Sequence, residues 1–136
     1  MTLLNPKAVK QSWLQRVLGI PPTVLENCLE MCQRHFKYTP QPNEALYPNK
    51  VHYPLAPWEG DCDDFAATLA SVLGKATNAP TYFHYCYAPS GVFHVGVSCK
   101  DNRGNLWFMD CIQHQPTLVS DCQALGYVFK QLKRIA

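Results

Sequence analysis

Charged residues are scarce in this chain of 136 residues, at 16%, compared with roughly 25% in an average soluble domain. The 12 Lys and Arg residues nearly balance the 10 Asp and Glu residues, so the formal net charge is only +2. The one small basic group fits a solvated face and comprises Lys130, Lys133 and Arg134. A surface that binds polyanions therefore has little support, and we expect no nucleic-acid partner.

Long apolar runs are also lacking. No stretch approaches 18 uninterrupted apolar residues, so we expect no membrane span and no membrane partner. The first residues show no charged segment followed by an apolar run, which a signal peptide would need. These absences predict a cytoplasmic location, in the cell or in a host cell, while a phage particle or a secreted effector stays open. The oligomeric state is not predicted.

The apolar content, by contrast, is that of a folded protein. Hydrophobic residues make up 47% of the chain and aromatic residues 12%, which excludes a disordered chain. The length predicts a single domain over residues 1–136, large enough to fold on an apolar core alone. Seven cysteines are present, and because seven is odd, at least one thiol stays unpaired in any set of intramolecular disulfides.

Helical spacing of apolar residues predicts two N-terminal helices. The first begins at Asn5 and Pro6 and ends at Gly19, and the second begins at a capping box formed by Thr23 and Glu26. Residues 38–60 then lose all periodicity and contain five of the eleven prolines. Long irregular loops inside compact domains are often binding loops. We therefore expect residues 38–60 to form one wall of a cleft.

A third helix is predicted directly after Gly60, and the pattern then changes to strands. Residues 81–88, 92–100 and 106–112 are rich in β-branched and aromatic side chains, and residues 101–105 predict a hairpin turn between the last two. Residues 120–135 fit either a helix or a last strand. The layout predicts an α+β fold in which the N-terminal helices, with the helix after Gly60, pack on an antiparallel sheet.

Four of the ten acidic residues lie within residues 59–64, around Cys62. Cys62 is predicted in the first turn of the third helix, with Asp61 as the N-cap. Gly60 is expected to let the preceding backbone pass close to the thiol, as an incoming acyl group requires. Unpaired N–H groups and the positive end of the helix dipole favour a thiolate there, whereas the carboxylates oppose it. A cationic partner would therefore be needed. The alternative is a capped helix with a small buried cysteine.

Two further residues interrupt apolar strands. His94 lies in the second predicted strand, and Asp110 closes the third strand. Gly96, two residues after His94 on the same face, is expected to keep space clear beside it. The turn at residues 101–105 brings these strands together, so Asp110 can orient His94 if a bulge absorbs the difference in register. Taken alone, His94 also fits a hydrogen-bonded structural imidazole.

The sequence resembles the transglutaminase-like cysteine peptidases, a branch of the papain superfamily. The motifs are Gly-Asp-Cys-Asp-Asp-Phe-Ala at 60–66, His-Val-Gly-Val at 94–97 and Phe-Met-Asp at 108–110. The resemblance implies a papain-like fold and a thiol hydrolase or acyltransferase acting on peptide, isopeptide or glutamine amide bonds. It implies Cys62 as nucleophile, His94 as general base and acid, and Asp110 as orienting carboxylate. It also implies a protein or peptide substrate, such as a peptidoglycan peptide.

The resemblance supplies no clear oxyanion residue, so Asn49, Trp58 and Asp61 are candidates beside the backbone N–H of Cys62. No metal or cofactor is expected. One alternative function is a peptidoglycan endopeptidase or amidase of the NlpC/P60 type, and another is an inactive scaffold. A zinc site is a further alternative, because Cys28, Cys32 and His35 share one helical face, although core packing explains the two cysteines equally simply.

Overall fold

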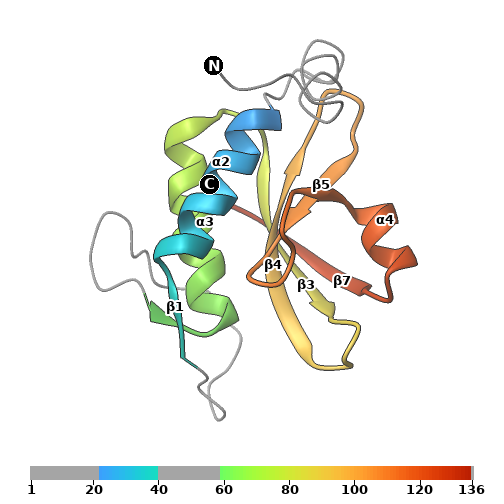
Figure 1. Ribbon diagram of the computed structural model, residues 1–136. Helices are drawn as coiled ribbons and strands as arrows, with labels where there is room; N and C mark the ends of the chain where they lie inside the picture. The colour runs from blue at the N-terminus through green and yellow to red at the C-terminus, as the bar shows by residue number, and fades with distance from the viewer. Residues whose placement is uncertain (1–21, 40–58, 136) are drawn as a thin grey trace, which may run out of the picture.

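The computed structural model describes residues 22–39 and 59–135. The expected first helix at 5–18 and most of the proline-rich segment, including Asn49 and Trp58, lie outside these ranges. The described part contains helices on both sides of a five-stranded sheet (Figure 1). In chain order the elements are α2 (Pro22–His35), β1 (Lys37–Tyr38), β2 (Glu59–Gly60), α3 (Cys62–Ala76), β3 (Thr81–Tyr87), β4 (Phe93–Lys100), β5 (Leu106–Met109), β6 (Thr117–Leu118), α4 (Val119–Ala124) and β7 (Val128–Arg134).

The sheet has the strand order β6-β5-β4-β3-β7, with antiparallel pairing throughout. Strands β3 to β5 correspond to the three predicted strands, β6 adds a short strand beside β5, and β7 returns along the free edge of β3. The turn between β4 and β5 is fixed by Asp101, whose Oδ1 accepts hydrogen bonds from the backbone N–H groups of Arg103 (2.8 Å) and Asn105 (2.9 Å). This side-chain bonding explains why an Asp begins the tight connection.

The two faces of the sheet have different covers. Helices α2 and α3 pack on one face, and their core includes Leu29, Leu69 and Leu73, all fully buried, together with Val97 of β4. A smaller cluster lies on the other face beneath α4, where Phe108 and Tyr127 are buried (Figure 1). Because successive side chains of a strand point to opposite faces, both clusters draw on the same strands.

Several predicted boundaries needed correction. Helix α2 begins at Pro22, so Thr23 lies in its first turn rather than at the cap, and proline is well suited to the first helical position. Strand β5 ends at Met109 rather than at residue 112, because the Asp110 side chain binds the next backbone N–H groups and turns the chain. The ambiguous 120–135 segment contains both elements, a short helix followed by a strand.

Three short strands were not predicted: β6, β1 and β2. β1 and β2 pair in parallel, joining Lys37 with Glu59 and Tyr38 with Gly60. They therefore bring the two ends of the proline-rich segment together beside the start of α3. None of the helices in the described residues has the length and apolar content that a membrane span requires.

Candidate active site

The site is built around the first residue of α3. Cys62 begins the helix and Asp61 is its N-cap residue, as predicted. The side chain of Asp64 folds back to accept a hydrogen bond from the backbone N–H of Asp61 through Oδ2 (3.2 Å). The first helical hydrogen bond runs from Phe65 N–H to the Asp61 carbonyl (3.0 Å). The N–H of Cys62 therefore lies outside the helical ladder, at the positive end of the dipole.

Gly60 makes this arrangement possible, but for a different reason than the sequence suggested. We expected it to let an acyl group approach the thiol. Its φ of +146° and a 2.1 Å separation between an added Cβ and Asp64 Oδ2 show instead that the absent side chain leaves room for the Asp64 carboxylate. Gly60 thus allows the helix start to be capped by Asp64.

His94 and Asp110 are joined directly. His94 Nε2 lies 2.8 Å from Asp110 Oδ2, and both side chains are almost fully buried. The expected bulge is absent between β4 and β5: Val97 pairs with Met109 in regular register, so Asp110 comes opposite Gly96 and reaches His94 diagonally. Diagonal neighbours across a sheet are close enough for long or polar side chains to meet.

The Asp110 carboxylate is held by three further donors. Oδ1 accepts the backbone N–H groups of Ile112 (2.9 Å) and Gln113 (2.7 Å), and Oδ2 accepts the hydroxyl of Tyr127 (3.0 Å) as well as His94. These donors fix the orientation of the carboxylate. Asp110 is therefore a preorganised acceptor behind His94.

Two residues that support this arrangement were missed from the sequence. Tyr127 lies just before β7, in the segment that could be read as helix or strand. Gln33 on α2 donates from Nε2 to the carbonyls of Asp110 (3.0 Å) and Gln113, and so ties the turn after β5 to the helical layer. Neither residue has a sequence signal, because both contacts join segments that are distant in the chain.

The electrostatics of His94 link it to both neighbours. Burial alone would lower its pKa, but hydrogen bonds with Asp110 and with Cys62 outweigh burial and raise the pKa of His94 to about 9. Since Nε2 is occupied by Asp110, Nδ1 is the nitrogen that remains for Cys62. Cys62 and Asp110 both act on His94, and together they favour the protonated imidazole.

Gly96 also differs from its predicted use. We expected it to keep space clear beside His94. An added Cβ would lie 2.4 Å from Phe108 Cζ and 2.7 Å from the Met109 carbonyl oxygen, so the space belongs to the Phe108 ring. Gly96 lets the Phe108 ring of β5 pack closely against β4. This packing supports the position of Asp110.

Outside this site, the buried cysteines and His84 have surroundings that fit a structural role. Cys28 and Cys32 are buried in the core while His35 is exposed, which favours core packing over the zinc alternative. His84 Nδ1 lies 2.9 Å from Ser98 Oγ, and burial lowers the pKa of His84 to about 4. Burial is also the main cause that raises the pKa of each cysteine outside the site, to about 11 or 12 for five of them: Cys32, Cys86, Cys99, Cys111 and Cys122. All seven cysteines are free.

Of the oxyanion candidates, only Asp61 lies in the described residues. Its backbone N–H is already bonded to Asp64, and an ionised carboxylate accepts hydrogen bonds without donating any. The arrangement therefore argues against Asp61 as an oxyanion donor. The backbone N–H of Cys62 keeps the position that such a donor needs.

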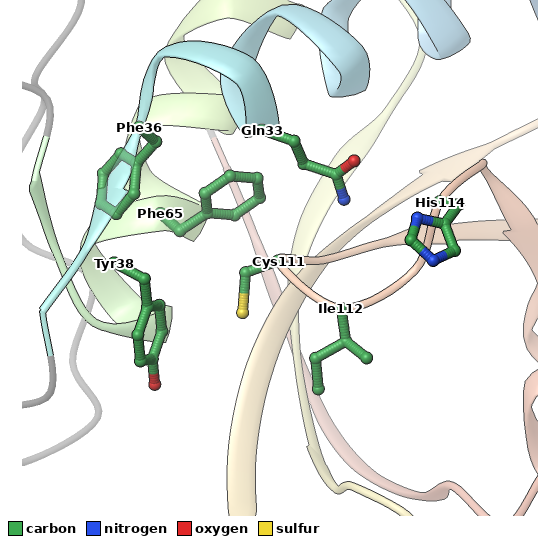
Figure 2. A pocket seen from close by; sticks show the side chains of 7 residues that line it. All are labelled: Gln33, Phe36, Tyr38, Phe65, Cys111, Ile112 and His114. Atoms are coloured by element: carbon green, nitrogen blue, oxygen red, sulfur yellow. The ribbon is translucent and has the colours of Figure 1, made fainter.

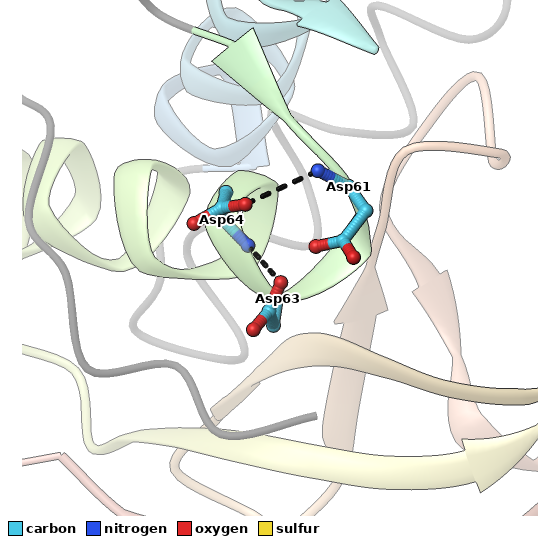
Figure 3. A group of neighbouring side chains, drawn as sticks. All are labelled: Asp61, Asp63 and Asp64. Atoms are coloured by element: carbon cyan, nitrogen blue, oxygen red, sulfur yellow. Dashed lines mark hydrogen bonds between the residues drawn. The ribbon is translucent and has the colours of Figure 1, made fainter. Parts of the chain in front are cut away.

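A cluster of carboxylates surrounds the same helix start. One oxygen from each of Asp61, Asp63 and Asp64 lies within 4.8 Å of the others, and all three residues are buried (Figure 3). Asp63 Oδ1 accepts the N–H of Asp64 (2.9 Å). Asp61 Oδ1 is buried without a hydrogen-bond partner, an arrangement that is costly unless a proton or cation compensates it. Oxygen clusters of this kind suit hard cations such as Ca²⁺.

Comparison with known proteins gives matches to structures alone. No family model matches the sequence, and no curated protein matches it. LapG of Legionella pneumophila superposes with a TM-score of 0.64 at 15% identity, over 95% of this chain and 75% of LapG. Calcium-bound LapG superposes with a TM-score of 0.65 at 15% identity, over 93% of this chain and 76% of LapG. A proposed cysteine protease of Cytophaga hutchinsonii superposes with a TM-score of 0.59 at 16% identity, over 95% of this chain and 47% of the protease chain.

These matches establish the fold. LapG is a transglutaminase-like cysteine protease, and the chain shares its mixed arrangement of helices and antiparallel sheet. The α+β, transglutaminase-like fold predicted from the sequence is therefore confirmed.

Proposed function

We propose that the protein is a cysteine peptidase that cleaves amide bonds through Cys62, His94 and Asp110. The observation that carries the proposal is the continuous connection from a thiol at a helix start, through a buried imidazole, to a carboxylate 2.8 Å away. The shared fold with cysteine proteases supports the same chemistry. A nucleophile, a base and an orienting acid in this relation form the arrangement used for covalent acyl transfer.

In the proposed reaction, His94 accepts the proton of the Cys62 thiol. The thiolate attacks the substrate carbonyl carbon, forming a C–S bond and an oxyanion that faces the N–H of Cys62 at the helix start. The C–N bond then breaks as the imidazolium gives its proton to the leaving amine. Water, deprotonated by His94, attacks the thioester carbonyl. The C–S bond then breaks to release the carboxylic acid product, and the pair of Cys62 thiolate and His94 imidazolium is restored.

The raised pKa of His94 fits the second step of this scheme. An imidazole that stays protonated up to about pH 9 is a ready proton donor to the leaving amine at neutral pH. The same positive charge offsets the carboxylates beside Cys62, which was the cationic partner that the sequence required. Asp110 stabilises this charge and fixes the ring.

The experiment is a digest of a complex peptide mixture by three purified forms of the protein. Wild type should generate new peptide termini, and Cys62→Ala should lower that activity by at least roughly 10³-fold. Cys28→Ala is the matched control because it removes a core thiol outside the site and should retain the activity. Wild type that cleaves no better than Cys62→Ala would favour the inactive scaffold instead.

A second proposal is that Asp61, Asp63 and Asp64 bind Ca²⁺. Two observations support it: the unpartnered Asp61 Oδ1, and the calcium-bound form in which LapG has been determined. The sequence alone had suggested no metal. A bound Ca²⁺ would offset the negative charge of the three carboxylates next to the thiol. The chain's own part in the reaction remains that of Cys62, His94 and Asp110.

A further inference from the structure

A pocket of about 300 Å³ opens beside the proposed active site (Figure 2). Its floor is aromatic: Phe36 and Phe65 meet edge to face, with ring centroids 5.2 Å apart. Ile112 lies on the side opposite Tyr38, and Cys111 lies between them in this view. The volume is at the small end of ligand pockets, which suits one large side chain rather than a cofactor.

Three walls of the pocket are adjacent in sequence or pairing to residues of the proposed site. Phe65 follows Cys62 by three residues on α3, and such residues share a helical face. Cys111 directly follows Asp110. Tyr38 pairs with Gly60 across β1 and β2, two residues before Cys62. The pocket therefore adjoins the point at which a scissile bond would be held.

Electrostatics agree with this position. Burial and the negative charges of Cys62, Cys111, Asp61 and Asp63 together raise the pKa of Tyr38 to about 12. This observation supports the placement that the backbone pairing already gives.

The lining favours an apolar occupant. Among the described residues that line the pocket, none is Asp, Glu, Lys or Arg. Ile112 and Tyr38 are exposed to 53% and 52% although both present large apolar surfaces. The polar side chains of the lining are Gln33, Tyr38, Cys111 and His114, and the Gln33 amide is already bonded to backbone carbonyls. The lining itself therefore offers no Asp, Glu, Lys or Arg side chain to pair with a charged side chain that loses its water here.

We infer that this pocket binds a large apolar side chain of the polypeptide substrate, one that lies within three residues of the bond cleaved. The inference rests on the proposed function and adds to it a class of substrate. Filling the pocket with a Leu or Phe side chain would remove that side chain, the aromatic floor and Ile112 from water. Selectivity for that side chain over a charged one should therefore be ten-fold or more.

The test profiles cleavage sites in a peptide library by mass spectrometry, with Cys62→Ala as background. Wild type should show Leu, Phe, Met or Ile enriched at one position within three residues of the cleaved bond. Ile112→Asp places a carboxylate at the pocket rim and should remove that enrichment, with Lys or Arg rising at the same position. Leu125→Asp makes the same change at another exposed leucine-sized position, beyond α4, and should leave the profile unchanged.

The outcomes separate the two proposals. Cleavage that depends on Cys62 but shows no apolar preference, or a preference that Ile112→Asp leaves intact, overturns the pocket and keeps the peptidase. Absence of cleavage by wild type overturns the proposed function, and the role of the pocket is lost with it. Circular dichroism and the melting temperature of Ile112→Asp confirm that an altered profile comes from a folded protein.

Discussion

Tyr127 donates its hydroxyl to Asp110 Oδ2 at 3.0 Å, the same oxygen that binds His94 Nε2 at 2.8 Å. The two contacts compete for the electron density of one carboxylate oxygen. Tyr127 therefore moderates how strongly Asp110 attracts the proton on His94, in addition to holding the carboxylate in place.

Tyr127→Phe removes the hydroxyl and keeps the ring that packs against Phe108. With one donor fewer, Asp110 becomes a stronger acceptor, and the pKa of His94 should rise further above about 9. Peptidase activity requires the imidazolium, so the alkaline limb of its pH profile should move to higher pH. A purely structural Tyr127 would lower activity at every pH and leave the limb where it is.

Asp110→Asn should lower peptidase activity and move the alkaline limb of its pH profile to lower pH. The backbone N–H groups of Ile112 and Gln113 would retain the amide oxygen, so the NH₂ group would face His94. His94 Nε2 would then have to accept, Nδ1 would carry the proton, and the thiol could not pass its own proton to it. We expect a loss of activity of roughly 10²- to 10⁴-fold.

The alkaline limb of the residual Asp110→Asn activity should lie below that of wild type, because the contribution of Asp110 to the raised pKa of His94 is removed while burial still lowers that pKa. A limb that stays near pH 9 would mean that Asp110 is not the cause of the raised pKa. Titration of the His94 ring by NMR in both proteins measures the shift independently of turnover.

Gly96→Ala should destabilise the fold by roughly 1–3 kcal/mol, because its Cβ would overlap the Phe108 ring and the Met109 carbonyl. Gly74→Ala is the matched control: an added Cβ there has no neighbour within 4 Å, and alanine in a helix should stabilise by about 0.5–1 kcal/mol. Chemical denaturation measures both. Equal effects of the two changes would contradict the packing assigned to Gly96.

Asp61→Asn tests the proposed Ca²⁺ site. Wild type should gain thermal stability when Ca²⁺ is added to protein freed of metal with EGTA, by about 2.7 kcal/mol at a concentration 100 times the dissociation constant. The variant should show little gain, because the unpartnered oxygen of Asp61 would no longer be anionic. Asp121→Asn, an exposed acid on α4, should behave as wild type. A response to Ca²⁺ that survives Asp61→Asn would place the ion elsewhere.

Much of the architecture could be predicted because it follows from local patterns. Apolar spacing located α2 and α3, the alternation of β-branched residues located β3 to β5, and Asp101 marked the turn between β4 and β5. The joint spacing of Cys62, His94 and Asp110 indicated the site, since each residue is out of place in its own apolar element. The transglutaminase-like fold was confirmed, whereas the catalytic roles stay predictions.

The features that were missed depend on contacts between distant segments. Gln33 reaches Asp110 from α2, and Tyr127 reaches it from the chain before β7. No spacing rule in the sequence connects either residue with Asp110. The roles of Gly60 and Gly96 were misread for the same reason: each leaves room for a side chain, Asp64 or Phe108, whose position depends on tertiary packing. The β1–β2 pair joins chain segments that flank the proline-rich region, where periodicity gives no signal.

The most direct test of the catalytic proposal is the rate at which iodoacetamide modifies each cysteine near neutral pH, read by peptide mass mapping. Cys62 should be alkylated at least ten-fold faster than any of the other six cysteines, whose pKa values are raised by burial. His94→Gln should remove that advantage while the protein stays folded. If Cys62 in wild type is modified no faster than the remaining cysteines, the account of Cys62 as an activated nucleophile is wrong.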